Sequence, residues 1–223
     1  MLSKFLRSFG KEPDSPAPAP ASPTRARRRM VLNVGGHSKH VGIPAHYDGW
    51  VHHLLDIDAR GSPDILCDAR DLAGQPAGTY DAIYCSHNLE HYRHHDARRV
   101  LAGFLHVLKD DGFAEVKVPD VLAVMKKVVA EGLDLDDQLY VAPSGPIQVR
   151  DVVWGYGVEI EASGNDFYSH KTGFSPRSLT AFLENAGFAE VFLDGAGAER
   201  LEVAAIAFKR AGPNPYKSLF DLA

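Results

Sequence analysis

Glycine, aspartate, serine and histidine stand at the ends of four short apolar runs between residues 30 and 91. The runs end, in order, at Gly35-Gly36, Asp56, Asp68 and Ser86-His87. In an open parallel sheet, ligands bind outside the carboxyl ends of the strands. Four polar ends in succession therefore predict one ligand that lies across them.

These side chains must be positioned by strands that alternate with helices. Apolar positions recur at helical spacing in 96–109, where Asp96 is expected to cap the start, and again in 121–130. Ser175-Pro176 begins a further helix that Gly187 closes. We expect strands at 30–34, 51–57, 64–67, 81–85, 113–118, 191–193 and 203–208. This alternation predicts an α/β fold with a mostly parallel sheet, in which the last two strands form an antiparallel hairpin at the edge.

The segment 37–50 is predicted to be a loop with at most a short helical turn. Gly42, Pro44 and Gly49 interrupt it, and it shows no apolar period of 3.6 residues. The first strand is followed by no GxGxxG, which is the fingerprint of dinucleotide-binding folds. These features argue against NAD(P) as the ligand.

The stretch resembles the class I S-adenosylmethionine (SAM)-dependent methyltransferases, and within them a small bacterial type. Three motifs carry the resemblance: Leu32-Asn33-Val34-Gly35, the run Ser86-His87-Asn88-Leu89-Glu90-His91, and Val107-Leu108-Lys109 followed by Gly112. The motifs cover about residues 30–120, and the general layout extends to about 208. The resemblance implies a three-layer α/β/α Rossmann-like fold and SAM as the cofactor.

The resemblance also implies which residues hold the cofactor. Asp56 would accept the ribose hydroxyls, since two carboxylate oxygens match a vicinal diol, and Asp58 is its rival two residues on. Asp68 would accept from the adenine amino group. His37 departs from the family pattern, because the third position of the first loop is usually glycine. The cofactor-binding set is Asn33, Gly35, Gly36, Asp56, Asp68, Ala69 and Ser86.

Two histidines after the fourth strand are the candidate catalytic residues. In this fold the end of that strand faces the methyl group, and an imidazole could serve as a general base or orient an acceptor oxygen. His87 and His91 are therefore the predicted pair, while His94 and His95 are interpreted as surface residues. The spacing of His87 and His91 also suits a metal, but no HExxH motif accompanies it. The sequence thus predicts no metal ion.

Residues 131–173 form an insertion on the acceptor side of the predicted domain. They are rich in glycine, aspartate and aromatic residues and lack strong periodicity, which is typical of a lid or surface elaboration. Its candidate substrate residues are Tyr156, Asn165, His170 and Lys171.

Charge and composition predict the rest of the domain plan. Residues 1–29 carry seven basic and two acidic residues and a proline-rich run, so they are expected to be a disordered basic segment. The domain is expected at 30–210 and a flexible tail at 211–223. Because the whole chain has a net charge of −5 and the first 29 residues carry +5, the remainder carries −10. An acidic body argues against nucleic acid as a partner.

No apolar run is long enough to span a bilayer. Residues 1–10 could at most make weak contact with a membrane surface, and the two cysteines are expected to be buried thiols in a cytoplasmic protein.

The predicted function is methyl transfer from SAM to an acceptor that the sequence does not identify, with a small molecule or glycan as the expected partner. Two alternatives stay open: a catalytically inactive SAM-fold binding module, and an unrelated nucleotide-binding α/β enzyme.

Overall fold

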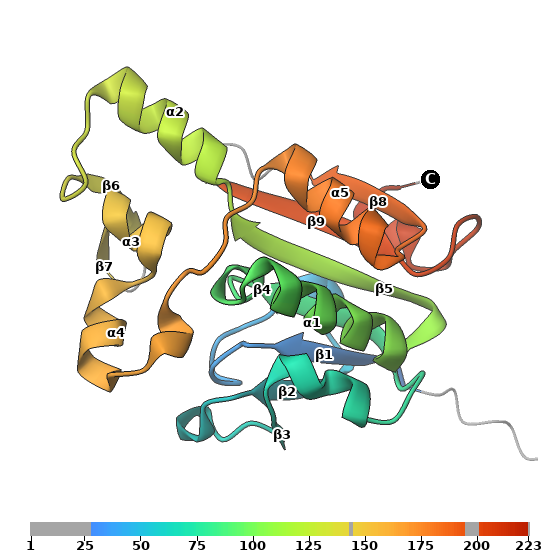
Figure 1. The fold of residues 1–223 in the computed structure, drawn as a ribbon. Helices are drawn as coiled ribbons and strands as arrows, with labels where there is room; N and C mark the ends of the chain where they lie inside the picture. Colours follow the sequence, from blue (N-terminus) through green and yellow to red (C-terminus); the bar gives the residue numbers. More distant parts are fainter. Residues whose placement is uncertain (1–27, 143–144, 195–200, 223) are drawn as a thin grey trace, which may run out of the picture.

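The computed structural model describes residues 28–142, 145–194 and 201–222. Its centre is a seven-stranded sheet with the strand order β3-β2-β1-β4-β5-β9-β8 (Figure 1). The strands are β1 (Met30–Val34), β2 (Val51–Asp56), β3 (Ile65–Leu66), β4 (Tyr80–Ser86), β5 (Leu108–Pro119), β8 (Glu190–Asp194) and β9 (Glu202–Phe208). The first five are parallel, and β9 runs antiparallel to both β5 and β8. The predicted fold and its antiparallel hairpin at the edge are confirmed.

One face of the sheet is covered by helices α1 (His94–Val107) and α5 (Pro176–Ala186). Their apolar stripes pack on the strands around Phe104 and Leu183, which are both fully buried. Helix α5 has the predicted caps, since Ser175 accepts the Ser178 N–H and Gly187 closes the helix with φ +113°. The predicted cap of α1 was wrong, because the N-cap position is Arg93 and Asp96 lies inside the first turn.

The other face is covered mainly by aromatic side chains from two irregular segments. After β1 the chain makes only a short 3-10 turn, Ala45–Tyr47, as the glycine and proline pattern predicted. The gap left by a missing crossover helix is filled from residues 43–50 and from the C-terminal residues 216–222. Tyr216 lies between Phe113 and Trp50, with ring centroids 5.4 Å and 5.7 Å away.

Within the segment that was expected to be a flexible tail, Tyr216 is buried, and Leu219, Phe220 and Leu222 are partly buried against the same core. The Tyr216 hydroxyl donates to Asp81 Oδ1 at 2.8 Å, and the other oxygen of Asp81 accepts the Met30 N–H. Asp81 is only 5% exposed. Lys109 Nζ lies 2.5 Å from this carboxylate, so one buried charge joins β1, β4, β5 and the C-terminal segment.

The insertion has more structure than its weak periodicity indicated. Helix α2 (Val121–Glu131) leads into a hairpin of β6 (Gln138–Ala142) and β7 (Gly145–Gln148), followed by α3 (Val149–Trp154) and α4 (Gly157–Ser163). Ile147 and Val152 of the insertion pack with Val124 of α2 in a small separate hydrophobic core. In Figure 1 the insertion stands on the left, beside the carboxyl ends of the parallel strands.

Within the described part of the chain, no helix combines the length and apolar character needed to cross a membrane. Cys85 is buried and Cys67 is partly buried, and both are free thiols. The predicted basic, proline-rich segment lies almost wholly outside the described residues.

Replacing Tyr216 with alanine tests the docking of the C-terminal segment. The change removes an aromatic ring from the core and a hydrogen bond from Asp81, so we expect the free energy of unfolding to fall by about 3 kcal/mol, as for other buried aromatic residues. Urea denaturation followed by circular dichroism measures it. Ser218→Ala, an exposed change on the same turn, is the matched control. Equal stability of the two variants would mean that the segment does not belong to the core.

Candidate active site

A cavity of about 500 Å³ lies at the carboxyl ends of β1 to β4, where the sequence placed the ligand. This volume falls within the roughly 300–1,000 Å³ that is usual for small-molecule sites. Its lining comes from all four strand ends and from the insertion. The residues are Gly35, His37, Asp56, Ile57, Asp68, Arg70, His87, Asn88, His91, Tyr92, Arg93, Asp96, Asp166, Phe167, Tyr168 and Lys171.

The first loop is tight at both of its glycines. A Cβ on Gly35 would lie 2.0 Å from Asn88 Nδ2, and one on Gly36 would lie 2.1 Å from Asn33 Nδ2. Gly35 also has φ +73°, which favours glycine. Gly35 therefore lines the cavity, whereas the buried Asn33 supports the loop from behind through Gly36.

His37, where the resemblance led us to expect a glycine, adopts a left-handed φ of +57°. That conformation costs a non-glycine residue roughly 1–2 kcal/mol. The cost is offset in part by a hydrogen bond, because the His37 N–H donates to Asp56 Oδ2 at 2.8 Å. The loop thus keeps its shape without a third glycine.

Asp56 and Asp58 are both nearly buried but differ in what they hold. Asp56 lines the cavity and accepts the backbone N–H groups of His37 and Asp58, one on each oxygen, which leaves further lone pairs on both oxygens. Asp58 does not line the cavity. Its carboxylate accepts from the Arg60 N–H and Nε–H and from the Tyr168 hydroxyl. The geometry thus favours Asp56 as the acid that faces a ligand.

At the end of β3, Asp68 lines the cavity together with Arg70. The Arg70 backbone and guanidinium both donate to the Asp68 carboxylate, with Nη2 at 2.6 Å from Oδ2. Burial by itself would raise the pKa of Asp68, but the hydrogen bonds from Arg70 outweigh it and the pKa is lowered. Asp68 is therefore a carboxylate at neutral pH. Ala69 is buried in the following 3-10 turn and does not line the cavity.

The end of β4 brings both predicted histidines to the cavity, whereas Ser86 lies behind its lining. His87 has a left-handed φ of +50°, and its Nε2 lies 2.8 Å from Glu202 Oε2. Burial would lower the pKa of His87, but the contacts with Glu202 and Glu90 raise it to about 10. His87 is thus an ion-pair partner of two glutamates. His91 Nδ1 lies 3.3 Å from the Ser169 carbonyl oxygen.

Comparisons with known proteins identify the family. The model of a methyltransferase domain family matches residues 14–191, which is most of the chain. The chain belongs to this methyltransferase family. The predicted family, the class I SAM-dependent methyltransferases, is confirmed together with its fold and with SAM as the cofactor. No protein of curated function matches the sequence.

Three solved structures share the fold at low sequence identity. A SAM-dependent methyltransferase from Archaeoglobus fulgidus is 17% identical with a TM-score of 0.50, and the match covers 82% of this chain and 86% of that one. The CMeT domain of citrinin polyketide synthase is 10% identical with a TM-score of 0.52, covering 85% and 48%. A chain of the complex between the Haloferax volcanii Trm112 methyltransferase activator and a methyltransferase is 13% identical with a TM-score of 0.50, covering 85% and 86%.

On the acceptor side of the methyltransferase, one of the four predicted substrate residues lines the cavity. Lys171 lies there, with its ammonium group 2.8 Å from the Asp166 carbonyl oxygen. His170 lies behind it, and its Nδ1 is 2.9 Å from the Val152 carbonyl oxygen. Tyr156 packs against the small hydrophobic core around Val124 and Val152, and Asn165 precedes the 3-10 turn Asp166–Tyr168 without a side-chain hydrogen bond to it.

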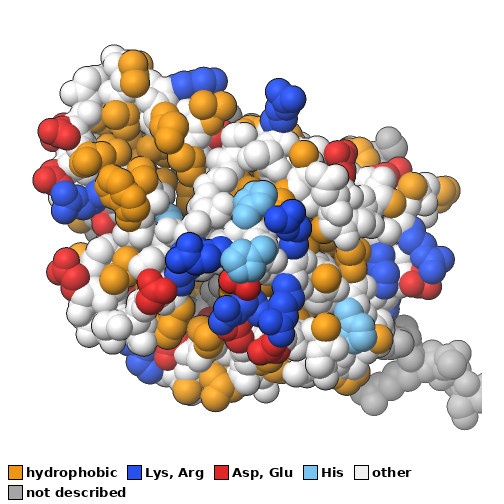
Figure 2. Space-filling model, in the orientation of Figure 1, with side chains coloured by type: hydrophobic (Ala, Val, Ile, Leu, Met, Phe, Trp, Pro, Cys, Tyr) orange, Lys and Arg blue, Asp and Glu red, His pale blue; other side chains and the backbone are white. Residues whose placement is uncertain are grey.

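Sequence reasoning missed several lining residues of the methyltransferase, among them Arg70, Asn88, Phe167 and Tyr168. Arg70 and Asn88 stand beside predicted site residues, so their position was a usable signal. In Figure 2, basic side chains and histidines gather in the middle of the face drawn, and hydrophobic side chains gather at the upper left, over α2 and α3. Leu122 and Val129 of α2 and Trp154 of α3 are among the exposed hydrophobic residues.

A cluster of four side chains ties the insertion to the loop after β2. Tyr168 donates to Asp58 Oδ2 at 2.6 Å, and Arg60 donates to Asp58, to Tyr168 and to Glu159 of α4. Hydrogen bonds from Arg60 lower the pKa of Asp58, although burial opposes this effect. Burial and the bond to Asp58 raise the pKa of Tyr168 to about 12, so it remains a hydroxyl donor. The cluster Asp58-Arg60-Glu159-Tyr168, called the latch below, holds the insertion over the cavity.

Tyr168→Phe tests whether the latch holds the insertion over the cavity. It removes the hydrogen bond to the nearly buried Asp58 carboxylate, which is worth about 1.5–3 kcal/mol, so local opening should become roughly tenfold or more frequent. We expect faster amide exchange across residues 156–171, measured by mass spectrometry. Tyr156→Phe, which deletes a hydroxyl in the same insertion but outside the latch, should exchange like the wild type. Equal rates in both variants would contradict the latch.

Proposed function

We propose that SAM binds across the four strand ends with its parts in the order of the strands. The amino-acid end of SAM would lie against the first loop at Gly35, and the ribose hydroxyls against Asp56. The adenine would lie between Ile57 and the Asp68-Arg70 pair. This order is supported by a continuous lining from β1 to β3. Asn33 and Gly36 would shape the first loop, and Ala69 and Ser86 would support the site from behind.

The acceptor is proposed to be a small molecule or a glycan unit that enters from the insertion side. The observation that carries this proposal is the joint lining of one cavity by the strand ends and by Asp166 to Lys171. The latch draws this segment over the cavity, which suits a ligand that is enclosed. A net charge of −10 outside the first 29 residues disfavours a nucleic acid acceptor.

The chemistry needs positioning more than activation. A nucleophilic atom of the acceptor attacks the methyl carbon in line, the bond from that carbon to the sulfonium sulfur breaks, and S-adenosylhomocysteine leaves with the electron pair. The protein must exclude water and hold the acceptor against the methyl group. His91, at the β4 end of the cavity and next to Ser169, is proposed to orient the acceptor there.

The substitutions Asp56→Asn and Asp58→Asn test which of the two acids accepts the ribose hydroxyls of SAM. Asp56→Asn should weaken SAM binding by at least about tenfold, because an acceptor for the ribose hydroxyls is lost at a cost of about 1.5–3 kcal/mol. Asp58→Asn should leave SAM affinity within a few-fold and loosen the latch instead. Calorimetric titration with SAM and S-adenosylhomocysteine measures both. A large loss in Asp58→Asn alone would show that the wrong acid was assigned, and no binding by the wild type would remove the proposal.

His91→Ala tests the acceptor side. Turnover should fall by at least about tenfold, a modest part of the effect usual for a positioned catalytic group, while SAM affinity stays within a few-fold. The assay follows labelled methyl transfer from SAM into a pool of small metabolites and sugars. His95→Ala, on the exposed start of α1, is the control. If the wild type binds SAM but transfers no methyl group to any pool, the alternative of a non-catalytic binding module is favoured.

A further inference from the structure

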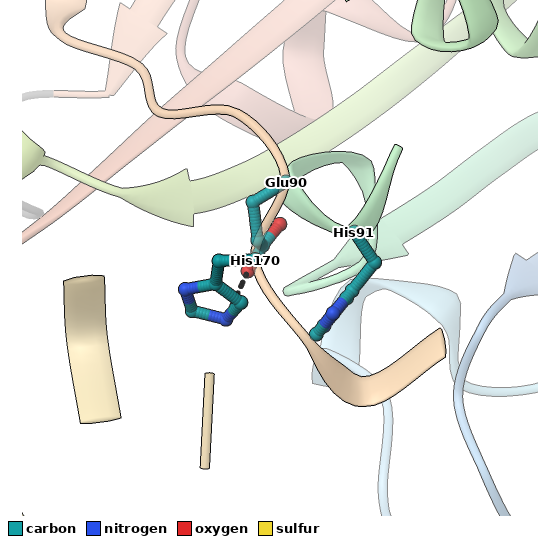
Figure 3. A group of neighbouring side chains, drawn as sticks. All are labelled: Glu90, His91 and His170. Carbon is teal, nitrogen blue, oxygen red and sulfur yellow. Dashed lines mark ion pairs between the residues drawn. The ribbon is translucent and has the colours of Figure 1, made fainter. Parts of the chain in front are cut away.

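Glu90, His91 and His170 converge at the border between the cavity and the insertion (Figure 3). Each offers one ligand atom, and these atoms all lie within 4.8 Å of one another. Glu90 and His91 follow β4, whereas His170 comes from the segment that closes the insertion. His91 also lines the cavity, so the cluster is continuous with the acceptor side.

The carboxylate of Glu90 is the unusual member of the cluster. The residue is 1% exposed, and neither of its oxygens has a hydrogen-bond partner among the described residues. The nearest ring nitrogens to Oε1 are His87 Nδ1 at 3.5 Å and His170 Nε2 at 4.0 Å. His87 already engages Glu202 through its other nitrogen. A buried carboxylate without hydrogen bonds is strongly destabilising unless a cation compensates it.

In both histidines, Nδ1 lies near a backbone carbonyl oxygen, which leaves the lone pair on Nε2. His170 Nδ1 lies 2.9 Å from the Val152 oxygen, and because a carbonyl can only accept, the proton is on Nδ1 and Nε2 carries the lone pair. His91 Nδ1 is placed in the same way, 3.3 Å from the Ser169 oxygen. A histidine that donates its second N–H to a carbonyl is the usual arrangement of a metal ligand.

The backbone around the cluster holds His170 in place. The Glu90 carbonyl accepts the N–H groups of Lys171 and Thr172, at 2.8 Å and 3.1 Å, and the His170 N–H donates to the Trp154 oxygen. Gly155 makes this approach possible, since a Cβ there would lie 2.4 Å from the Tyr168 oxygen. The fold therefore positions His170 against Glu90 from two sides.

We infer that Glu90, His91 and His170 form a binding site for a divalent transition-metal cation. Two imidazoles and one carboxylate suit manganese, iron, cobalt or zinc better than calcium or magnesium, which prefer all-oxygen ligands. Metal–ligand bonds are about 2.0–2.2 Å long, so the three ligand atoms must move closer to one another when the ion binds. Rotation of the three side chains can bring about this movement. The cation would ligate the Glu90 carboxylate directly, whereas His87 lies 3.5 Å away and makes no hydrogen bond with it.

The position of the site indicates what the metal does. With three protein ligands, the coordination positions that remain open on the His91 side face the cavity. There an oxygen of the acceptor would bind and be held against the methyl group, which deepens and rests on the proposed function. The sequence predicted no metal because it considered only neighbours of His91, whereas the third ligand lies in the distant insertion.

The test uses the full chain, freed of metal with a chelator and titrated separately with Mn²⁺, Co²⁺, Zn²⁺ and Mg²⁺. We expect one transition-metal ion per chain, found by calorimetry and elemental analysis, and a Co²⁺ absorption band that reports nitrogen ligands. His170→Ala and Glu90→Gln should each weaken binding by at least roughly 10- to 100-fold, the loss found even for outer partners of metal ligands. His95→Ala should bind like the wild type.

Each outcome decides the inference. Absence of a bound ion, or equal affinity in wild type and His170→Ala, would overturn it and leave His87 as the counter-ion of Glu90. If Glu90→Gln does not fold, His170→Ala decides alone, with circular dichroism as the check of folding. Titration of the metal-free chain with SAM keeps the two proposals apart. SAM binding without metal binding refutes only the metal site, and loss of SAM binding in a metal-loaded chain refutes only the proposed function.

Discussion

The carboxylate of Asp56 is the constraint on which the cavity depends. It accepts one backbone N–H from the first loop and one from the loop after β2, so a single side chain at the end of a strand fixes both walls. The left-handed backbone of His37 is tolerated because this bond favours it. The close contacts at Gly35 and Gly36 then restrict the first loop to one conformation. The Asp56 carboxylate therefore fixes the conformation of the site in the absence of a ligand.

The loop after β2 also connects the central sheet to the insertion. Asp58 lies two residues beyond Asp56 and anchors the latch, which reaches α4 and the 3-10 turn with Tyr168. The segment that follows Tyr168 carries His170 and Lys171 and hydrogen-bonds to the carbonyl of Glu90. The cofactor side and the acceptor side are thus joined by short chains of contacts, so movement of the insertion must disturb both.

The parts that sequence alone predicted are those set by local pattern. Apolar runs that end in polar residues gave the strands and the cavity edge, because strand ends and ligand site coincide in parallel sheets. Tyr216 and the Asp58-Tyr168 contact were out of reach, since they depend on residues more than a hundred positions apart and have no periodicity. His170 was named for its polarity, but its position beside Glu90 follows from the packing at Gly155.

The use of C-terminal residues to cover one face of the sheet has a consequence for biosynthesis. Five of the seven strands of the central sheet are made before residue 120, yet Phe113 lacks its ring contacts with Tyr216 and Phe220 until those residues have been made. During synthesis the half-built sheet exposes this apolar face, and such transient surfaces are prone to aggregation. A chaperone that shields the face until residues 216–222 are made would suit this order of assembly.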